Sequence, residues 1–237
     1  MGTRERKQRE FEQREALFLD TAARLIAEDG LLNLQMAKLA EACDYATGTL
    51  YQHFSSREDL LVAVAATGMR EHHELFERAA AWEAGNRDRM FAIAVADVVY
   101  HQRNPVHAGL VQYVFTEVVW SNASEARRAA IHDACQPVTG MVDRILSDAI
   151  EAGELESANL RPMELALGPW SLCHGMRALV ATHGLLERLD IRKPERLLYR
   201  QVQVYLNGLN WQPLFPTDDS QALDALVARA RQQVLNT

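Results

Sequence analysis

The side chains best suited to contact another molecule lie in one short stretch in the first quarter of the chain. Thr47, Gly48 and Thr49 open this stretch, and Tyr51 and His53 follow within four positions. If the stretch is helical, its first turn presents hydroxyl groups and backbone amides, which bind base edges and phosphates in DNA. Glycine at position 48 allows close approach of the backbone to a partner, because it has no Cβ atom.

The charge of the chain gives weaker support to nucleic-acid binding. The formal net charge is −7, with 25 Lys and Arg against 32 Asp and Glu, whereas the phosphate backbone of DNA favours basic proteins. The position of individual cations matters more: Lys38 and Arg57 flank the stretch and could form charge-assisted hydrogen bonds with phosphate. The N-terminal arm adds four basic residues, Arg4, Arg6, Lys7 and Arg9. Such an arm is equally typical of a solvated tail.

The elements that must position these groups are predicted to be helices. Apolar residues recur at spacings of three and four, and no sustained alternation indicates strands. We expect a first helix at about 10–29, which Gly30 ends, and short helices at about 35–43 and 47–53. A helix-turn-helix needs a small residue where its helices cross, inward apolar residues and a turn residue that tolerates positive φ. Four residues meet these needs: Leu39, Ala40, Asp44 and Leu50.

The segment 17–64 strongly resembles the DNA-binding domain of the tetracycline-repressor (TetR) family. The resemblance rests on Gly-Thr-Leu-Tyr-x-His-Phe at 48–54 and on Ser-x-Arg-Glu-x-Leu-Leu directly after it. It implies a DNA-binding transcriptional regulator in which Tyr51 and His53 contact phosphate. Packing in the core is the alternative role for these two side chains.

Three features depart from the family pattern. Asp44 stands where such proteins usually have glycine in the turn, and aspartate tolerates positive φ second best. Ala46 replaces the usual serine cap of the recognition helix, which typically costs about 1 kcal/mol, and Thr47 is the candidate to cap it instead. Gln35 and Met36 replace the serine or threonine that commonly opens the second helix. We therefore expect an unusual operator sequence.

The rest of the chain is also predicted to be helical, with boundaries marked by proline, glycine and capping residues. A capping box at 55–58 opens a fourth helix, 83–88 is a loop, and another helix ends at Asn104-Pro105. Further helices are expected at about 110–120, 125–152, 162–183 and 194–209. Thr217 or Asp218 is expected to cap a last one.

The expected fold class is all-α, with an N-terminal three-helix helix-turn-helix domain and a larger helical ligand-binding and dimerisation domain. The N-terminal arm and helix-turn-helix domain are expected at 1–58. The effector-binding and dimerisation domain is expected at 59–212, and a C-terminal helical extension at 213–237.

The resemblance implies that the late helices, at about 162–183 and 194–211, form a four-helix bundle with a second copy of the chain. Two recognition helices would then enter successive major grooves of a pseudo-palindromic DNA operator. It also implies an effector pocket among the middle helices. Its expected lining residues are Tyr100, His101, Tyr113, Trp120, Met141, Trp170 and His174.

Large apolar side chains with a few polar tips suit a small, mostly apolar effector, although each of them could also be a core residue. We expect a homodimeric repressor that such a ligand releases from DNA. Control of the same dimer by a metal ion or a partner protein is an open alternative, and so is an activator.

An enzyme is a remote alternative, because the common catalytic motifs are missing. No G-x-S-x-G, H-E-x-x-H, phosphate-loop or dinucleotide-binding pattern occurs, and His132-x-x-Cys135 supplies at most two metal ligands. We therefore expect no catalytic residue, no cofactor and no metal site.

The composition is that of an ordinary globular protein, with 48% hydrophobic and 24% charged residues. No apolar run approaches the roughly 20 residues that span a bilayer, and no signal-peptide core follows the charged start. We expect a cytoplasmic protein. Cys43, Cys135 and Cys173 lie far apart in the sequence, which favours core positions over disulfides.

Overall fold

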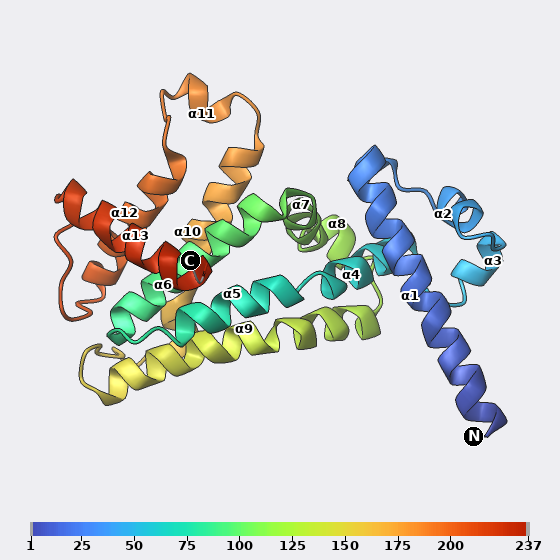
Figure 1. Ribbon diagram of the computed structural model, residues 1–237, viewed down its shortest axis with the longest axis horizontal. Helices are drawn as coiled ribbons and strands as arrows, with labels where there is room; N and C mark the ends of the chain where they lie inside the picture. The colour runs from blue at the N-terminus through green and yellow to red at the C-terminus, as the bar shows by residue number, and fades with distance from the viewer. Residues whose placement is uncertain (1, 236–237) are drawn as a thin grey trace. The chain divides into compact units, whose positions relative to one another are not determined.

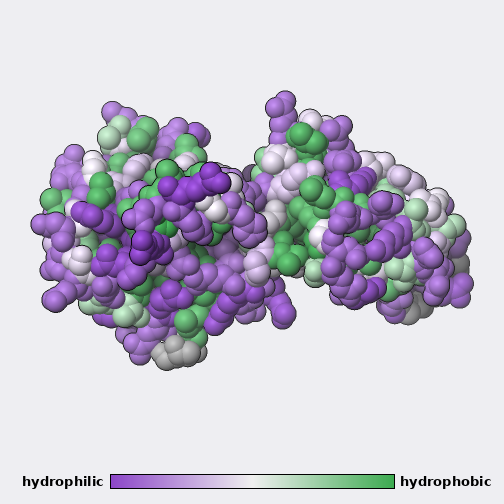
Figure 2. Space-filling view, turned by 90° about the horizontal axis from the view of Figure 1, so that it is seen from above, coloured by the Kyte–Doolittle hydropathy of each residue, from purple (hydrophilic) through white to green (hydrophobic). Residues whose placement is uncertain are grey.

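The computed structural model describes residues 2–235, apart from the side chain of Thr3, and consists of helices joined by short loops (Figure 1). Within that range no strand occurs, and the all-α class is confirmed. Met1 of the expected arm and residues 236–237 of the expected extension lie outside the described residues. The surface is mostly hydrophilic in the view of Figure 2, with scattered apolar patches.

The chain forms two compact units that do not follow its order in sequence. The first unit comprises Met1–Met69 and Asn104–Ala134, and the second comprises Arg70–Arg103 and Cys135–Thr237. The functional division expected at 1–58, 59–212 and 213–237 remains a prediction.

Helix α1 (Thr3–Asp29) is the long first helix of the first unit. Its buried apolar residues follow helical spacing: Phe18, Ala22, Leu25 and Ile26. Gly30 ends the helix with a φ of 87°, and its N–H donates to the carbonyl of Ile26 at 3.0 Å. The helix begins seven residues before the expected residue 10, because the basic arm, rich in Arg, Glu, Lys and Gln, favours helix.

The other helices of the first unit are η1 (Leu31–Asn33), α2 (Met36–Ala42), α3 (Thr47–Leu50), α4 (Arg57–Thr67), α7 (Pro105–Val114) and α8 (Glu117–Trp120). The regular part of α3 is shorter than the expected 47–53, and turns continue it to His53. The expected single helix at 110–120 is wrong. The hydroxyl of Thr116 donates to the Tyr113 carbonyl at 2.7 Å, a local bond that competes with helix continuation.

A serine cap opens α4, one residue later than expected. The Oγ of Ser56 accepts the N–H of Asp59 at 3.0 Å, so Ser56 is the cap rather than Ser55. Ser55 instead donates its N–H to the Asp59 carboxylate at 3.0 Å, and the N–H of Ser124 donates to the same carboxylate at 2.6 Å. The buried Asp59 thus joins the start of α4 to the segment that follows α8.

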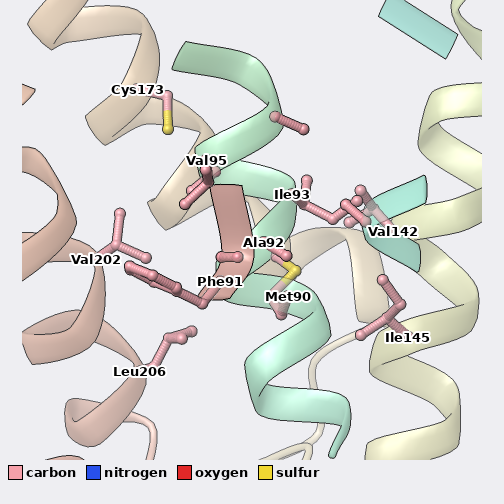
Figure 3. Packing of buried hydrophobic residues seen from close by; sticks show 14 of the residues in the cluster. Met90, Phe91, Ala92, Ile93, Val95, Val142, Ile145, Cys173, Val202 and Leu206 are labelled. Atoms are coloured by element: carbon pink, nitrogen blue, oxygen red, sulfur yellow. The ribbon is translucent and has the colours of Figure 1, made fainter. Parts of the chain in front are cut away.

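The second unit is built around α6 (Asn86–Arg103). Its other helices are α5 (Arg70–Ala80), most of α9 (Glu125–Glu151), α10 (Pro162–Ala181), α11 (Leu185–Arg188), α12 (Pro194–Gly208) and α13 (Ser220–Leu235). Every residue of α6 from 90 to 100 is buried. In Figure 3, Phe91 faces Val202 of α12, while Ile93 points toward Val142 of α9.

The late helices agree closely with expectation. Helices α9, α10 and α12 begin where predicted, and Pro137 and Pro169 lie inside α9 and α10. The cap of α13 is neither Thr217 nor Asp218 but Asp219, whose Oδ1 accepts the N–H groups of Gln221 and Ala222. One face of this last helix is apolar and buried, with Leu223, Leu226, Ala230 and Val234 along it, and α13 packs on α5 and α6.

A buried arginine anchors the segment that leads to α13. Arg87 is 3% exposed, and its guanidinium donates to the Trp211 carbonyl at 2.6 Å and to Gln203 Oε1 and Asn207 Oδ1, each at 2.7 Å. Burial lowers the pKa of Arg87 to about 10, so the group stays charged at neutral pH. Its neutral acceptors offset the cost of burying that charge.

Helices α10 and α12 approach closely at Gly168, which gives a stability prediction. A Cβ atom at this position would lie 2.0 Å from the Tyr205 ring. We expect Gly168→Ala to lower the free energy of unfolding by about 1–3 kcal/mol through overpacking, measured by chemical denaturation. Gly140→Ala in α9, where a Cβ atom has no neighbour within 4 Å, should raise it by about 0.5–1 kcal/mol. Equal effects of the two substitutions would contradict the close packing.

Candidate nucleic-acid interface

Helices α2 and α3 form the helix-turn-helix expected from the sequence. Asp44 occupies the turn with a φ of 59°, the conformation for which glycine is usual and which aspartate tolerates. The N–H of Tyr45 closes the turn by donating to the Ala40 carbonyl at 3.0 Å. Ala40 is the small residue at the crossing, and Leu39 and Leu50 are fully buried beneath it. The structure therefore meets each requirement with the residue that the sequence predicts.

The start of α3 differs from expectation in its cap. Ala46 is the N-cap residue and makes no side-chain cap hydrogen bond. Thr47 is already the first residue of the helix, so the expectation that it replaces the missing serine cap is wrong. A cap must have extended backbone before the first turn, and Ala46 has that conformation, with φ −69° and ψ 143°. The Thr47 hydroxyl is therefore not used as a cap.

The outer edge of α3 carries the groups that could contact DNA. Gly48 is exposed, and no heavy atom lies within 4 Å of the place a Cβ atom would take. Thr47 and Thr49 are half-buried beside it, and Tyr51 is 52% exposed. This edge thus combines three hydroxyl groups with a position at which backbone can approach a partner closely.

His53 lies on the opposite side, and the expected phosphate contact from its imidazole is not supported. Its side chain is fully buried. The ring stacks on Phe11 with 3.8 Å between centroids and meets the edge of Phe18 at 5.3 Å. Because no part of the side chain reaches the surface, the alternative role in core packing describes it better.

A charged network that was not predicted surrounds His53. Its Nδ1 lies 3.2 Å from Glu15 Oε2, and Arg127 Nη1 contacts Glu15 Oε1 at 2.9 Å. Arg127 also donates to the His53 carbonyl at 2.9 Å and lies over the Phe54 ring. Burial by itself would raise the pKa of Glu15, but hydrogen bonds from Arg127 and His53 outweigh it and hold the pKa below its usual value. The network joins α1, the end of the recognition segment and the start of α9.

The two expected cations at the interface have different surroundings. Arg57 donates from Nε to the Leu34 carbonyl and from Nη2 to the Leu31 carbonyl, each at 2.9 Å. It therefore supports the loop between α1 and α2. Lys38 is exposed on α2, where its Nζ pairs with Asp29 at 2.7 Å.

The residues expected to line an effector pocket are divided between the two units. Tyr113 and Trp120 belong to the first unit. The other five belong to the second unit: Tyr100, His101, Met141, Trp170 and His174. Tyr100 is buried, and His101, Met141 and His174 are partly buried, whereas Trp170 is 60% exposed on α10.

A buried polar cluster in the second unit includes residues that the sequence prediction missed. Asp97 contacts Arg177 at 2.5 Å, and the imidazoles of His72 and His101 lie within 3.7 Å of the same carboxylate. Burial alone would raise the pKa of Asp97, but His72, Arg177 and His101 more than offset this and hold it well below its usual value. The sequence does contain an indication of this cluster, because Asp97 is the one charged residue in the apolar run 90–100.

Among residues 2–235, no three or more His, Cys, Asp or Glu side chains gather in a way that could hold a metal ion. No helix in that range is both long enough and apolar enough to cross a bilayer. Cys43 and Cys173 are buried, as expected, and Cys135 is partly buried.

The Glu15 network gives a prediction about acid stability. Because the pKa of Glu15 is lower in the folded state, its contribution is complete above about pH 4.5 and is lost as the pH falls through the folded pKa. We expect Glu15→Gln to be less stable than wild type by about 1.5 kcal/mol at pH 7 and nearly as stable at pH 3, measured by urea denaturation. Glu12→Gln, exposed on the same helix, is the control. If the difference in free energy of unfolding between Glu15→Gln and wild type does not change with pH, the ionised Glu15 carboxylate does not stabilise the fold as proposed.

Comparisons with known proteins agree with this geometry. The family model for bacterial regulatory proteins of the tetR family matches residues 18–64, from the middle of α1 into α4. The fatty acid metabolism regulator protein of Bacillus subtilis (strain 168) is 23% identical over 138 residues, which are 58% of this chain and 69% of that protein.

Solved structures share the fold over most of the chain. RolR in complex with resorcinol has a TM-score of 0.62 at 16% identity, with 97% of this chain and 96% of RolR covered. The regulator FadR from Bacillus subtilis in complex with stearoyl-CoA has a TM-score of 0.58 at 18% identity, with 81% and 98% covered. A tetR-family regulatory protein from Rhodococcus RHA1 has a TM-score of 0.56 at 22% identity, with 83% and 97% covered. The segment 18–64 thus carries the helix-turn-helix of the tetR family of bacterial regulatory proteins, and the chain as a whole has the fold of solved TetR-family regulators.

Proposed function

We propose that the chain is a homodimeric repressor that a small, mostly apolar molecule releases from its DNA operator. The main support for the proposal is that the recognition segment has one buried side and one exposed side. Its inner residues Leu50, His53 and Phe54 are buried, while Gly48 and Tyr51 are exposed on the other side. A helix held in this way presents a fixed polar edge to the major groove.

On this proposal, the groups that contact DNA are Lys38, Thr47, Gly48, Thr49 and Tyr51. The threonine and tyrosine hydroxyls bind phosphates or base edges, and Gly48 allows the backbone to come close. Lys38 exchanges its partner Asp29 for phosphate, which is possible because both side chains are partly exposed. His53 and Arg57 take a different role and position the segment from inside.

A second copy of the chain is proposed to cover the outer face of α10 together with α12. Met163, Leu167 and Trp170 form an exposed apolar stripe at spacings of four and three along α10. Val204 adds an exposed apolar side chain on α12. Water-exposed apolar stripes of this kind favour burial against a partner. In a two-fold dimer the same stripe meets its own copy.

Two structural relatives support a small-molecule effector, since they were solved with resorcinol and with stearoyl-CoA. The middle helices of this chain are proposed to bind such a molecule. The ligand acts by stabilising a conformation of the dimer in which the two recognition helices no longer match two half-sites about 34–36 Å apart. DNA release then follows from linkage between the two binding equilibria.

Genomic footprinting with the purified chain tests this function. We expect protection of a pseudo-palindromic site with two half-sites, and lower affinity for that site when a stabilising ligand is added. A ligand that stabilises the protein and leaves operator affinity unchanged would overturn the release model. If no site is protected, the proposed repressor function is wrong.

The DNA contacts give a mutational prediction. Tyr51→Phe removes one hydroxyl from the exposed edge, and a hydrogen bond to a charged group contributes about 1.5–3 kcal/mol. We therefore expect about tenfold to hundredfold weaker binding to operator and non-operator DNA alike, measured by fluorescence anisotropy. Tyr113→Phe in α7 makes the same chemical change away from the helix-turn-helix and should bind as wild type. Equal affinities for all three proteins would refute the assignment of Tyr51.

The dimer gives a second prediction. Leu167→Glu places a charge in the middle of the α10 stripe, where burial against a second copy would leave it unpaired. We expect the variant to sediment as a folded monomer in analytical ultracentrifugation at micromolar concentration, whereas wild type sediments as a dimer. Ala225→Glu, at an exposed position of α13, is the control and should remain dimeric. A dimeric Leu167→Glu variant would place the interface elsewhere.

A further inference from the structure

The interior of the second unit holds polar side chains that DNA binding does not use. They come from three helices: His72 from α5, Asp97 and His101 from α6, and Arg177 from α10. Arg177 Nη1 contacts Asp97 Oδ2 at 2.5 Å, and His72 Nε2 and His101 Nδ1 lie 3.7 and 3.6 Å from Asp97 Oδ1. These side chains are only 12–18% exposed. A polar group this deep in a helical core normally has its hydrogen bonds filled.

In this cluster several hydrogen-bonding positions are not filled. Both ring nitrogens of His72 and the Nε of Arg177 are buried without a hydrogen-bond partner among the described residues. The other groups are engaged: His101 Nδ1 lies 2.6 Å from the Asp97 carbonyl, and Arg177 Nη2 lies 3.1 Å from His174 Nδ1. A neutral imidazole has one donor and one acceptor nitrogen. The unfilled set is therefore two donors and one acceptor, beside the carboxylate oxygen that faces His72.

The charges of the cluster are already balanced. Asp97 is ionised, because its pKa lies well below the usual value, and Arg177 is its partner. Burial lowers the pKa of His101, and burial together with Arg177 lowers that of His174, so both are neutral at pH 7. A charged ligand group would introduce a further buried charge without a partner, which is unfavourable.

We propose that this cluster recognises a hydroxyl group on an uncharged, mostly apolar effector of the phenol type. A hydroxyl accepts from Arg177 Nε and donates to the acceptor nitrogen of His72, so it fills both kinds of vacancy. A carboxylate only accepts, and an ammonium group only donates. The proposal rests on the proposed function, because it names the polar group of the effector that releases DNA.

The apolar surroundings favour an aromatic ring as the body of this ligand. The His72 ring lies 4.4 Å from the Phe76 ring and 4.6 Å from the Tyr100 ring, between centroids. Aromatic rings pack well at such distances, in stacked or tilted geometry. The Asp97–Arg177 contact joins α6 to α10. A ligand that binds to Arg177 would therefore act directly on α10, the helix proposed to form the dimer.

The test uses the full-length chain and four small probes: phenol, resorcinol, benzoate and toluene, each at millimolar concentration. We expect phenol and resorcinol to raise the Tm by a few degrees in thermal unfolding. Benzoate, which carries a charge, and toluene, which has no hydroxyl, should leave it unchanged. Stabilisation by benzoate or toluene without the phenols, or no shift with any of the four, would overturn the hydroxyl site.

A variant separates recognition from folding. His72→Phe keeps an aromatic ring beside Phe76 and removes both unfilled nitrogens, while Arg177 and His101 still face Asp97. The unliganded variant should therefore remain folded, with a Tm within a few degrees of wild type. Its affinity for phenol, measured by isothermal titration calorimetry, should fall at least tenfold. His132→Phe, at an exposed position of α9, should bind phenol as wild type does. Wild-type affinity in His72→Phe would overturn the proposal.

The proposed function can fail separately from this site. Phenols that bind through His72 and leave operator affinity unchanged would support the site and contradict the release mechanism. Conversely, a molecule that releases DNA and binds equally well to His72→Phe would support the release mechanism and contradict the site.

Discussion

The DNA-binding unit depends on the contact between His53, Glu15 and Arg127. Helix α3 is only Thr47–Leu50, far too short to be stable by itself. Its position is fixed by the helices on which it packs. His53, which follows α3, contacts Glu15 of α1 through its buried imidazole, and Arg127 of α9 contacts both Glu15 and the His53 carbonyl. If one member is lost, the others keep buried polar groups without partners, which is a larger penalty than the loss of a surface ion pair.

The same contact joins segments of the first unit that lie far apart in the sequence. The first unit includes Asn104–Ala134 as well as the helix-turn-helix. The chain therefore passes between the units three times, after Met69, Arg103 and Ala134. The last passage lies within α9, which carries Arg127 near its start and core residues such as Ile145 farther on. In the proposed switch, these passages are the covalent routes by which a ligand in the second unit can influence the recognition segment.

The sequence was sufficient for the fold class and for the helix-turn-helix geometry, because both depend on local patterns. Helical spacing, capping residues and the run at 48–54 are readable over a few residues. The role of His53 could not be predicted, because its partner Arg127 is 74 positions away in the sequence and a histidine occurs both in cores and on surfaces. The partners of Arg57 could not be predicted for the same reason, because they are backbone carbonyls that the sequence does not reveal. Asp97 could have been noticed, as an acid in a buried apolar run, but not its partner Arg177.

We infer that Arg127 holds the recognition segment in place without touching DNA itself. The decisive measurement is the operator affinity of Arg127→Met over a range of salt concentrations. We expect a folded dimer that binds at least about tenfold more weakly, with the same slope of affinity against salt as wild type. Affinity equal to wild type would show that Arg127 does not position the segment. A slope smaller by about 0.9 would contradict the inference as well, because that is the signature of a lost phosphate contact.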